Sequence, residues 1–164
     1  MWRNQPYGMP FLHPFKSIHL SHLCIIESQH MNQIIIYLTF SGNCQEAMKF
    51  YQACLGGVLE FQFLKETPEG EKFPEDYKKL VVNASLKKDH MVLMGTDLRD
   101  HQVVNGNNVS ILLSSKDKVQ LRTQYVNLVK DGIPTHPLET TNKGDLFGGL
   151  TDKYGHQWLF HCGN

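Results

Sequence analysis

Residues 37–57, with the sequence YLTFSGNCQEAMKFYQACLGG, decide the predicted fold of this chain. The segment starts as the end of a strand, turns, and continues as a short amphipathic helix. Five apolar residues at helical spacing form the buried stripe of that helix: Ala47, Met48, Tyr51, Cys54 and Leu55. Asn43 and Glu46 have the spacing of a capping box, in which each side chain accepts a hydrogen bond from a free backbone N–H. Gly56 and Gly57 then end the helix, because glycine adopts left-handed backbone without a steric penalty.

Three strands are predicted after this helix. Residues 58–65, VLEFQFLK, alternate apolar and polar side chains, which is typical of a strand with one buried face. Residues 67–79 form a polar loop, residues 80–86 alternate again, and residues 90–94 form a short apolar strand. Together with a first strand at residues 33–40, these segments give the order β-α-β-β-β.

The same order returns in the second part of the chain. Residues 109–113 predict a strand, and Ser114 or Ser115 is expected to cap a helix that ends at Gly132. The buried stripe of this helix is expected to contain Leu121, Tyr125, Leu128 and Val129, with Gln120, Gln124 and Asn127 facing solvent. Three more strands follow, at residues 133–138, 146–151 and 157–162. Pro134 and Pro137 place the first of them at a sheet edge, because proline donates no hydrogen bond to a neighbouring strand.

The two β-α-β-β-β halves, at about residues 31–97 and 108–164, predict an α+β fold. Each half has one helix to cover one face of a four-stranded sheet, so the other face needs a partner. The neighbouring half or a second subunit is able to supply it. Two sheets that face each other enclose a cleft, and an apolar cleft is the usual place for a small-molecule site. The sequence therefore predicts a single domain over residues 31–164.

Residues 1–30 differ in character from the rest of the chain. They contain three prolines and four histidines, and they show no helical or strand period. The spacing of His13, His19, His22 and His30 matches no standard metal-ligand pattern. We expect a disordered extension that arises from an upstream start, with Met31 as the natural first residue.

Composition excludes several classes of function. The chain has 16 acidic and 16 basic residues, so neither nucleic acid nor an anionic membrane is expected as a partner. No apolar run approaches the roughly 18 residues that a membrane span requires. The four cysteines form no CxxC pair, which favours free thiols in a reducing cytoplasm.

Three segments resemble a known family. TFSGNCQEAMKFYQACLGG at residues 39–57 resembles the opening motif of the PhnB-like branch of the glyoxalase/bleomycin-resistance/dioxygenase group, the vicinal oxygen chelate superfamily. HMVLMGTD at residues 90–97 and KGDLFGGLTDKYGHQWLF at residues 143–160 are similar to motifs that close the two halves in that branch. The resemblance implies paired βαβββ modules, an eight-stranded incomplete barrel or cleft, and a homodimer.

Many relatives in this superfamily bind a divalent metal in the cleft. The positions that the resemblance assigns to metal ligands are occupied here by Ile36 or Tyr37, Leu93 or Met94, Ser110, and Trp158 or Leu159. None of these is a good ligand for a divalent ion. We therefore expect no metal cofactor, although His156 and His161 flank the last strand and leave a metal or acid–base role open.

Several residues are candidates for a substrate-binding site. The candidate set is Tyr37, Thr39, Met94, Ser110, Phe147, Trp158 and Phe160, of which the aromatic members either wall a pocket or pack in the core. Glu60 either projects into the cleft as a general base or lies on a solvated strand face. The chain has no catalytic triad order, phosphate-binding loop or dinucleotide fingerprint.

The function expected from the sequence is therefore that of a cytoplasmic homodimer that binds a small organic molecule without the usual metal ligands. One alternative is a metal-dependent lyase, isomerase or dioxygenase of the same superfamily. A second alternative is a non-catalytic resistance protein that sequesters a drug of the bleomycin type. A methyltransferase is not favoured, because no glycine loop for S-adenosylmethionine is present.

Overall fold

The structure is a computed structural model, and it describes residues 33–98 and 103–163. The described secondary structure belongs to one compact unit, residues 34–164. The predicted extension at residues 1–30 lies outside the described residues, as does Cys24.

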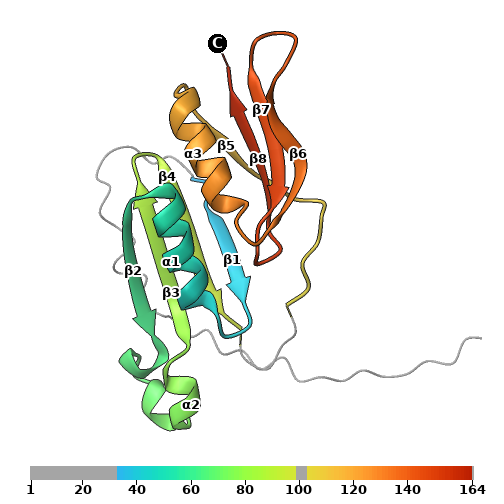
Figure 1. The fold of residues 1–164 in the computed structure, drawn as a ribbon. Coiled ribbons are helices and arrows are strands. Elements are labelled where there is room, and N and C mark those ends of the chain that lie inside the picture. Colours follow the sequence, from blue (N-terminus) through green and yellow to red (C-terminus); the bar gives the residue numbers. More distant parts are fainter. Residues whose placement is uncertain (1–32, 99–102, 164) are drawn as a thin grey trace, which may run out of the picture. The chain divides into compact units, whose positions relative to one another are not determined.

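The first half contains one main helix and four strands (Figure 1). Its elements are β1 (Ile36–Phe40), α1 (Cys44–Leu55), β2 (Val58–Phe63), β3 (Val81–Lys88) and β4 (Met91–Asp97). The segment between β2 and β3 was expected to be a polar loop. It forms the short helical turns η1 (Leu64–Glu66), η2 (Gly70–Lys72) and α2 (Glu75–Lys78).

The second half repeats this order. Its elements are β5 (Ile111–Ser114), α3 (Lys118–Leu128), β6 (Ile133–Thr140), β7 (Leu146–Thr151) and β8 (Gln157–Cys162). The bounds of β7 and β8 agree with the sequence prediction. Strand β5 starts two residues later than predicted, so Ser110 precedes the strand.

Each half forms a four-stranded sheet of the same topology. The strand orders are β1-β4-β3-β2 in the first sheet and β5-β8-β7-β6 in the second, with β6 at an edge as expected. The pairs β1–β4 and β5–β8 are parallel, and all other pairs are antiparallel. The predicted α+β fold of repeated βαβββ modules is confirmed.

One helix covers one face of each sheet. Helix α1 lies on β2, β3 and β4, and α3 lies on β8 (Figure 1). Gly95 permits the close approach of α1, because a Cβ atom there would lie only 3.1 Å from Met48 Sδ and 3.2 Å from Cys44 Sγ. The buried residues of both halves form a single hydrophobic cluster, so the halves share one core.

The predicted capping box at the start of α1 is wrong. The Asn43 side chain makes no capping hydrogen bond. The Cys44 N–H instead donates to Asp97 Oδ1 at the end of β4, at 2.9 Å. Glu46 accepts hydrogen bonds from Lys153 and Tyr154 in the second half. Tertiary partners thus replace the local capping contacts.

Two expectations for α3 also need correction. The N-cap is Asp117, whose carboxylate accepts from the N–H groups of Val119 and Gln120, and not Ser114 or Ser115. Gln124 was expected to face solvent, but only 8% of its surface is exposed. Helix α3 therefore buries a wider face than its apolar stripe suggested.

Within the described residues, every helix falls short of the length and apolar character that a membrane span needs.

Candidate functional site

The two sheets each have a face that is turned away from the covering helix, which we call the open face. Along β3, the side chains of Ala84 and Leu86 are fully buried on the helix side. Because successive side chains in a strand point to opposite faces, Ser85 between them belongs to the open face. The same alternation assigns the other strand residues to the open face or to the helix side, except where bulges shift the register next to Phe63 and within β6.

The open face of the first sheet carries three of the predicted site residues. Tyr37 lies directly opposite Met94 in the β1–β4 pairing, and Thr39 lies opposite Thr96. The Tyr37 side chain is 53% exposed, and Met94 is half-buried. The structure therefore brings Tyr37, Thr39 and Met94 together on one surface.

On the second sheet, Phe147 is the predicted site residue on the open face. It is 38% exposed, and its ring contacts the His136 ring at a centroid distance of 6.4 Å. In the β7–β8 pairing it lies opposite His161. Ser110 is exposed and lies just before β5.

Trp158 and Phe160 lie on the helix side of β8, apart from the other predicted site residues. Their exposed fractions are 2% and 0%, and Phe160 contacts the Tyr125 ring of α3 at 5.1 Å. The open-face neighbours on this strand are Leu159 and His161, which alternate with them. The strand itself was predicted correctly, but the sequence did not reveal which of its faces lies under the helix.

Leu112 and Leu159 lie on the open face of the second sheet but were not among the predicted binding residues. Leu112 of β5 lies opposite Leu159 of β8, and the Leu112 side chain is 56% exposed. This pair occupies the position in the second sheet that Tyr37 and Met94 occupy in the first. The βαβββ order implies that the first and last strands of each module pair in parallel. This pairing is the feature of the sequence that places Leu112 next to Leu159.

The open-face positions of these two parallel strand pairs do not suit a divalent metal ion. They offer a phenol, a thioether and two hydrocarbon side chains, from Tyr37, Met94, Leu112 and Leu159, whereas such ions are held by carboxylate, imidazole, thiolate or carbonyl groups. Within residues 33–98 and 103–163, no group of three or more His, Cys, Asp or Glu side chains is arranged to hold a metal.

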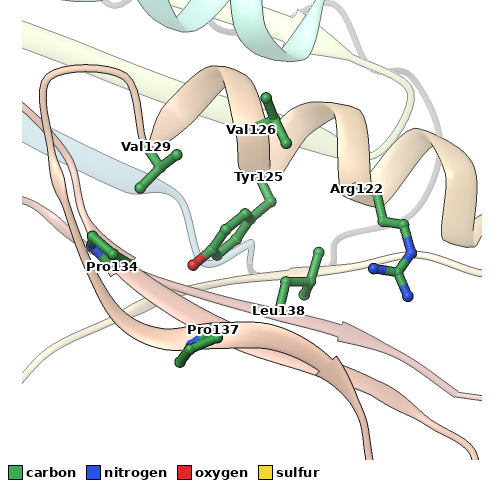
Figure 2. A pocket seen from close by; sticks show the side chains of 7 residues that line it. All are labelled: Arg122, Tyr125, Val126, Val129, Pro134, Pro137 and Leu138. Atoms are coloured by element: carbon green, nitrogen blue, oxygen red, sulfur yellow. The ribbon is translucent and has the colours of Figure 1, made fainter.

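A separate hollow lies between α3 and β6 (Figure 2). It has a volume of about 450 Å³ and is lined mainly by apolar side chains: Tyr125, Val126, Val129, Pro134, Pro137 and Leu138, with Arg122 at one end. The Tyr125 hydroxyl donates to the His136 carbonyl at 3.2 Å. This hollow lies on the helix side of the second sheet and includes none of the predicted site residues.

Asp152, predicted only as a turn former, is a buried acceptor that joins the two halves. Its Oδ2 atom accepts from the Tyr51 hydroxyl at 2.7 Å and from Trp158 Nε1 at 2.8 Å. Its Oδ1 atom accepts from the backbone N–H groups of Tyr154 and His156. Burial raises the pKa of the Tyr51 hydroxyl, and the neighbouring Asp152 carboxylate raises it further. Tyr51 is thus held as a neutral donor.

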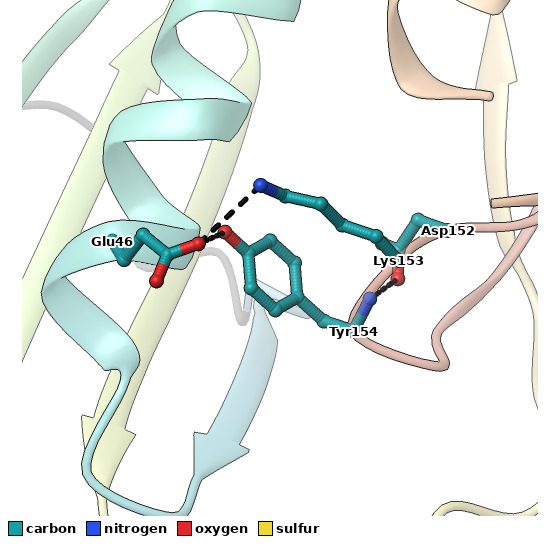
Figure 3. A network of polar contacts seen from close by, with 4 residues as sticks. All are labelled: Glu46, Asp152, Lys153 and Tyr154. Carbon is teal, nitrogen blue, oxygen red and sulfur yellow. Dashed lines mark hydrogen bonds and ion pairs between the residues drawn. The ribbon is translucent and has the colours of Figure 1, made fainter. Parts of the chain in front are cut away.

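A second contact between the halves lies at the surface (Figure 3). Glu46 Oε1 accepts from the Tyr154 hydroxyl at 2.7 Å and from Lys153 Nζ at 3.3 Å. These hydrogen bonds lower the pKa of Glu46. Burial, together with the bond to Glu46, raises the pKa of Tyr154 to about 12. Both groups keep their usual charge at neutral pH, so the contact is structural.

Two of the described cysteines, Cys44 and Cys54, are not activated as nucleophiles. Cys44, Cys54 and Cys162 are buried free thiols. Burial raises the pKa of Cys54 to about 11, and it raises the pKa of Cys44 further above the usual thiol range. Since the thiolate is the reactive form, Cys44 and Cys54 act as small apolar core residues.

Two buried polar atoms lack a hydrogen-bond partner among the described residues. They are Ser85 Oγ and His156 Nε2. Leaving such a group unpaired costs about 1–3 kcal/mol. His156 lies at the β7–β8 turn against Phe40, whereas Ser85 lies on the open face of the first sheet, beside the predicted site residues.

Comparisons with known proteins identify relatives of this chain. A family model described as 3-demethylubiquinone-9 3-methyltransferase matches residues 32–160. The crystal structure of protein PA1353 from Pseudomonas aeruginosa is 30% identical, with a TM-score of 0.70 over 80% of this chain and 98% of that chain.

Two further structures share the fold at lower identity. The PhnB protein from Bacillus cereus is 22% identical, with a TM-score of 0.64 over 80% of this chain and 100% of that chain. A glyoxalase-related enzyme from Fulvimarina pelagi is 16% identical, with a TM-score of 0.55 over 81% of this chain and 89% of that chain.

Proposed function

Because the chain belongs to the family described as 3-demethylubiquinone-9 3-methyltransferase, the PhnB-like branch of the glyoxalase superfamily, we propose that it binds a small organic molecule on the open faces of its sheets. The proposed protein is a homodimer, in which a second copy helps to cover these faces. The proposed binding requires no metal.

One observation carries this proposal. The parallel strand pair of each sheet, β1–β4 or β5–β8, presents apolar side chains on the open face, Tyr37 with Met94 and Leu112 with Leu159. Tyr37 and Leu112 are 53% and 56% exposed. Apolar side chains at equivalent places on two sheets are typical of an interaction surface, and organic ligands bind to mainly apolar walls with few polar anchors.

Native mass spectrometry of gently purified, tag-free protein tests the proposal. We expect a dimer that carries a small organic molecule, and we expect Tyr37→Ser to remove that molecule. Val126→Ser is the matched control, because Val126 is also exposed, at 58%, but lines the hollow beside α3. Loss of the ligand in Val126→Ser with retention in Tyr37→Ser would place the site in that hollow and overturn the proposal.

A metal-dependent enzyme of the same superfamily is the second candidate. The observation in its favour is His161, a half-buried histidine on the open face opposite Phe147. A divalent metal at about one ion per subunit, with an activity that is lost on chelation and in His161→Gln, would establish it. The drug-sequestering alternative predicts protection of cells against a glycopeptide antibiotic that is recovered unaltered.

A further inference from the structure

The Ser85 hydroxyl is the most unusual polar group on the open face of the first sheet. Its side chain belongs to a residue that is only 8% exposed, and Oγ has no hydrogen-bond partner among the described residues. Strand β3 lies inside the sheet, between β2 and β4, so both of its edges are already paired. A buried hydroxyl in this position lacks a partner that water supplies to exposed serines.

Strand pairing places Ser85 in a row of four side chains across the open face. Ser85 lies opposite Glu60 on one side and opposite Met94 on the other, and Met94 in turn lies opposite Tyr37. Neighbouring strands are about 4.8 Å apart. The row therefore has a polar end, Glu60 and Ser85, and an apolar end, Met94 and Tyr37.

The apolar end and the polar end of the row are suited to different chemical groups of one ligand. The Met94 and Tyr37 side chains offer a surface for a flat apolar ring, since thioether and aromatic groups both pack well on rings. At the polar end, an ionised carboxylate accepts hydrogen bonds only, whereas a serine hydroxyl both donates and accepts. A ligand hydroxyl satisfies both residues, because it donates to Glu60 and accepts from Ser85.

Charged alternatives fit this end less well. A ligand carboxylate would be repelled by Glu60. A ligand ammonium would have to leave water beside a side chain that is more than nine-tenths buried, and desolvating an ion costs more than desolvating a hydroxyl. Lys87, which is on the same face of β3 two residues from Ser85 and opposite Val58, adds a repulsive charge.

We propose that Ser85 and Glu60 form the polar subsite of the open-face site, and that the ligand is a flat, hydroxylated ring compound of the phenol class. The ring lies over Met94 and Tyr37, and its hydroxyl completes the missing hydrogen bond of Ser85. This inference rests on the proposed function, and it assigns the chemistry of the ligand that the open face binds.

Binding of four simple probes to the full chain tests this assignment. The probes are 4-ethylphenol, its methyl ether, 4-ethylbenzoate and 4-ethylbenzylamine, with dissociation constants measured by ligand-observed NMR titration. We expect 4-ethylphenol to bind at least about fivefold more tightly than each of the others, the effect of one hydrogen bond of ordinary strength. Tighter binding of the carboxylate or the amine would overturn the phenol assignment.

Two variants examine the polar subsite directly. Ser85→Ala is expected to weaken 4-ethylphenol about fivefold, and Glu60→Ala is expected to weaken 4-ethylphenol but not the methyl ether, which has no proton to donate. Ser41→Ala, in the exposed turn between β1 and α1, is the matched control and should leave both constants unchanged. The Tm of Ser85→Ala should equal or exceed that of the wild type, because the substitution removes an unpaired buried hydroxyl.

The outcomes separate this inference from the proposed function. If Tyr37→Ser weakens 4-ethylphenol while Ser85→Ala leaves it unchanged, the polar subsite is wrong and the open-face site stands. If 4-ethylphenol does not bind but the purified protein carries a molecule that Tyr37→Ser removes, the phenol class is wrong and the open-face site again stands. If neither variant affects any ligand, both proposals fail.

Discussion

At the scale of single residues, His156 is held in its neutral form. Its imidazole packs edge-on against the Phe40 ring at 5.5 Å, and Nε2 is buried without a hydrogen-bond partner among the described residues. Burial lowers the pKa of His156, and the nearby Asp152 carboxylate offsets only part of this effect. The folded protein therefore binds a proton at this site less readily than the unfolded chain does.

This shift predicts a loss of stability on acidification. The unfolded histidine titrates near pH 6.5, so the contribution of neutral His156 is complete above that pH. It is lost as the pH falls from about 6.5 toward the lower pKa of the folded state, by at most about 1.4 kcal/mol per pH unit for one proton. Urea unfolding at pH 7.5 and pH 5 should show a smaller pH effect in His156→Gln than in the wild type. An equal reduction in the exposed control His136→Gln would contradict this prediction.

At the scale of single elements, the start of α1 depends on a residue from β4. Asp97 accepts from the N–H of Cys44 with Oδ1 and from the N–H of Val81 with Oδ2, both at 2.9 Å. One carboxylate thus stabilises the first turn of α1 and the beginning of β3. Asn43, which occupies the N-cap position, contributes no such bond.

We therefore expect substitution of Asp97, which is far from α1 in the sequence, to destabilise the protein more than substitution of Asn43 at the N-cap. Asp97→Ala is expected to lower the free energy of unfolding by about 1–2 kcal/mol, because two backbone donors lose their acceptor. Asn43→Ala should cost less than about 0.5 kcal/mol, since its side chain makes no capping bond. Chemical denaturation measures both values. A larger loss of unfolding free energy in Asn43→Ala than in Asp97→Ala would show that Asn43 caps the helix after all.

At the scale of the whole folded unit, the hydrogen bond from Tyr51 to Asp152 joins residues that are 101 positions apart. Tyr51 is fully buried, and its ring also contacts the Trp158 ring at 5.7 Å. Since these groups belong to one shared core, the halves are expected to unfold together. The exposed Glu46 contact contributes less, because water and salt screen it.

Tyr51→Phe tests this coupling. It should lower the free energy of unfolding by about 1.5–3 kcal/mol, since a buried carboxylate loses one of its donors. Tyr125→Phe is the matched control with a smaller expected loss, because its bond to the His136 carbonyl is neutral and lies within the second half. In a Trp2→Phe background, Trp158 fluorescence and far-UV circular dichroism should report one coincident transition. Separate transitions would show that the halves fold independently.

Much of the fold follows from local patterns along the chain. The predicted bounds of β7 and β8 match the observed ones, and all five residues of the predicted apolar stripe of α1 are buried. The family motifs at residues 39–57, 90–97 and 143–160 lie within the matched region. These features were predictable because periodicity and turn chemistry act between residues that are close in sequence.

Only the tertiary structure decided which groups meet. It assigned Trp158 to the core and Leu159 to the open face, and it gave Glu46 its partners in the other half. It also left Ser85 Oγ buried without a partner on the face where Tyr37 and Met94 lie. The physical reason is that burial and hydrogen bonding depend on strands and helices far apart in the chain, and a strand pattern alone does not specify which of its two faces a helix will cover.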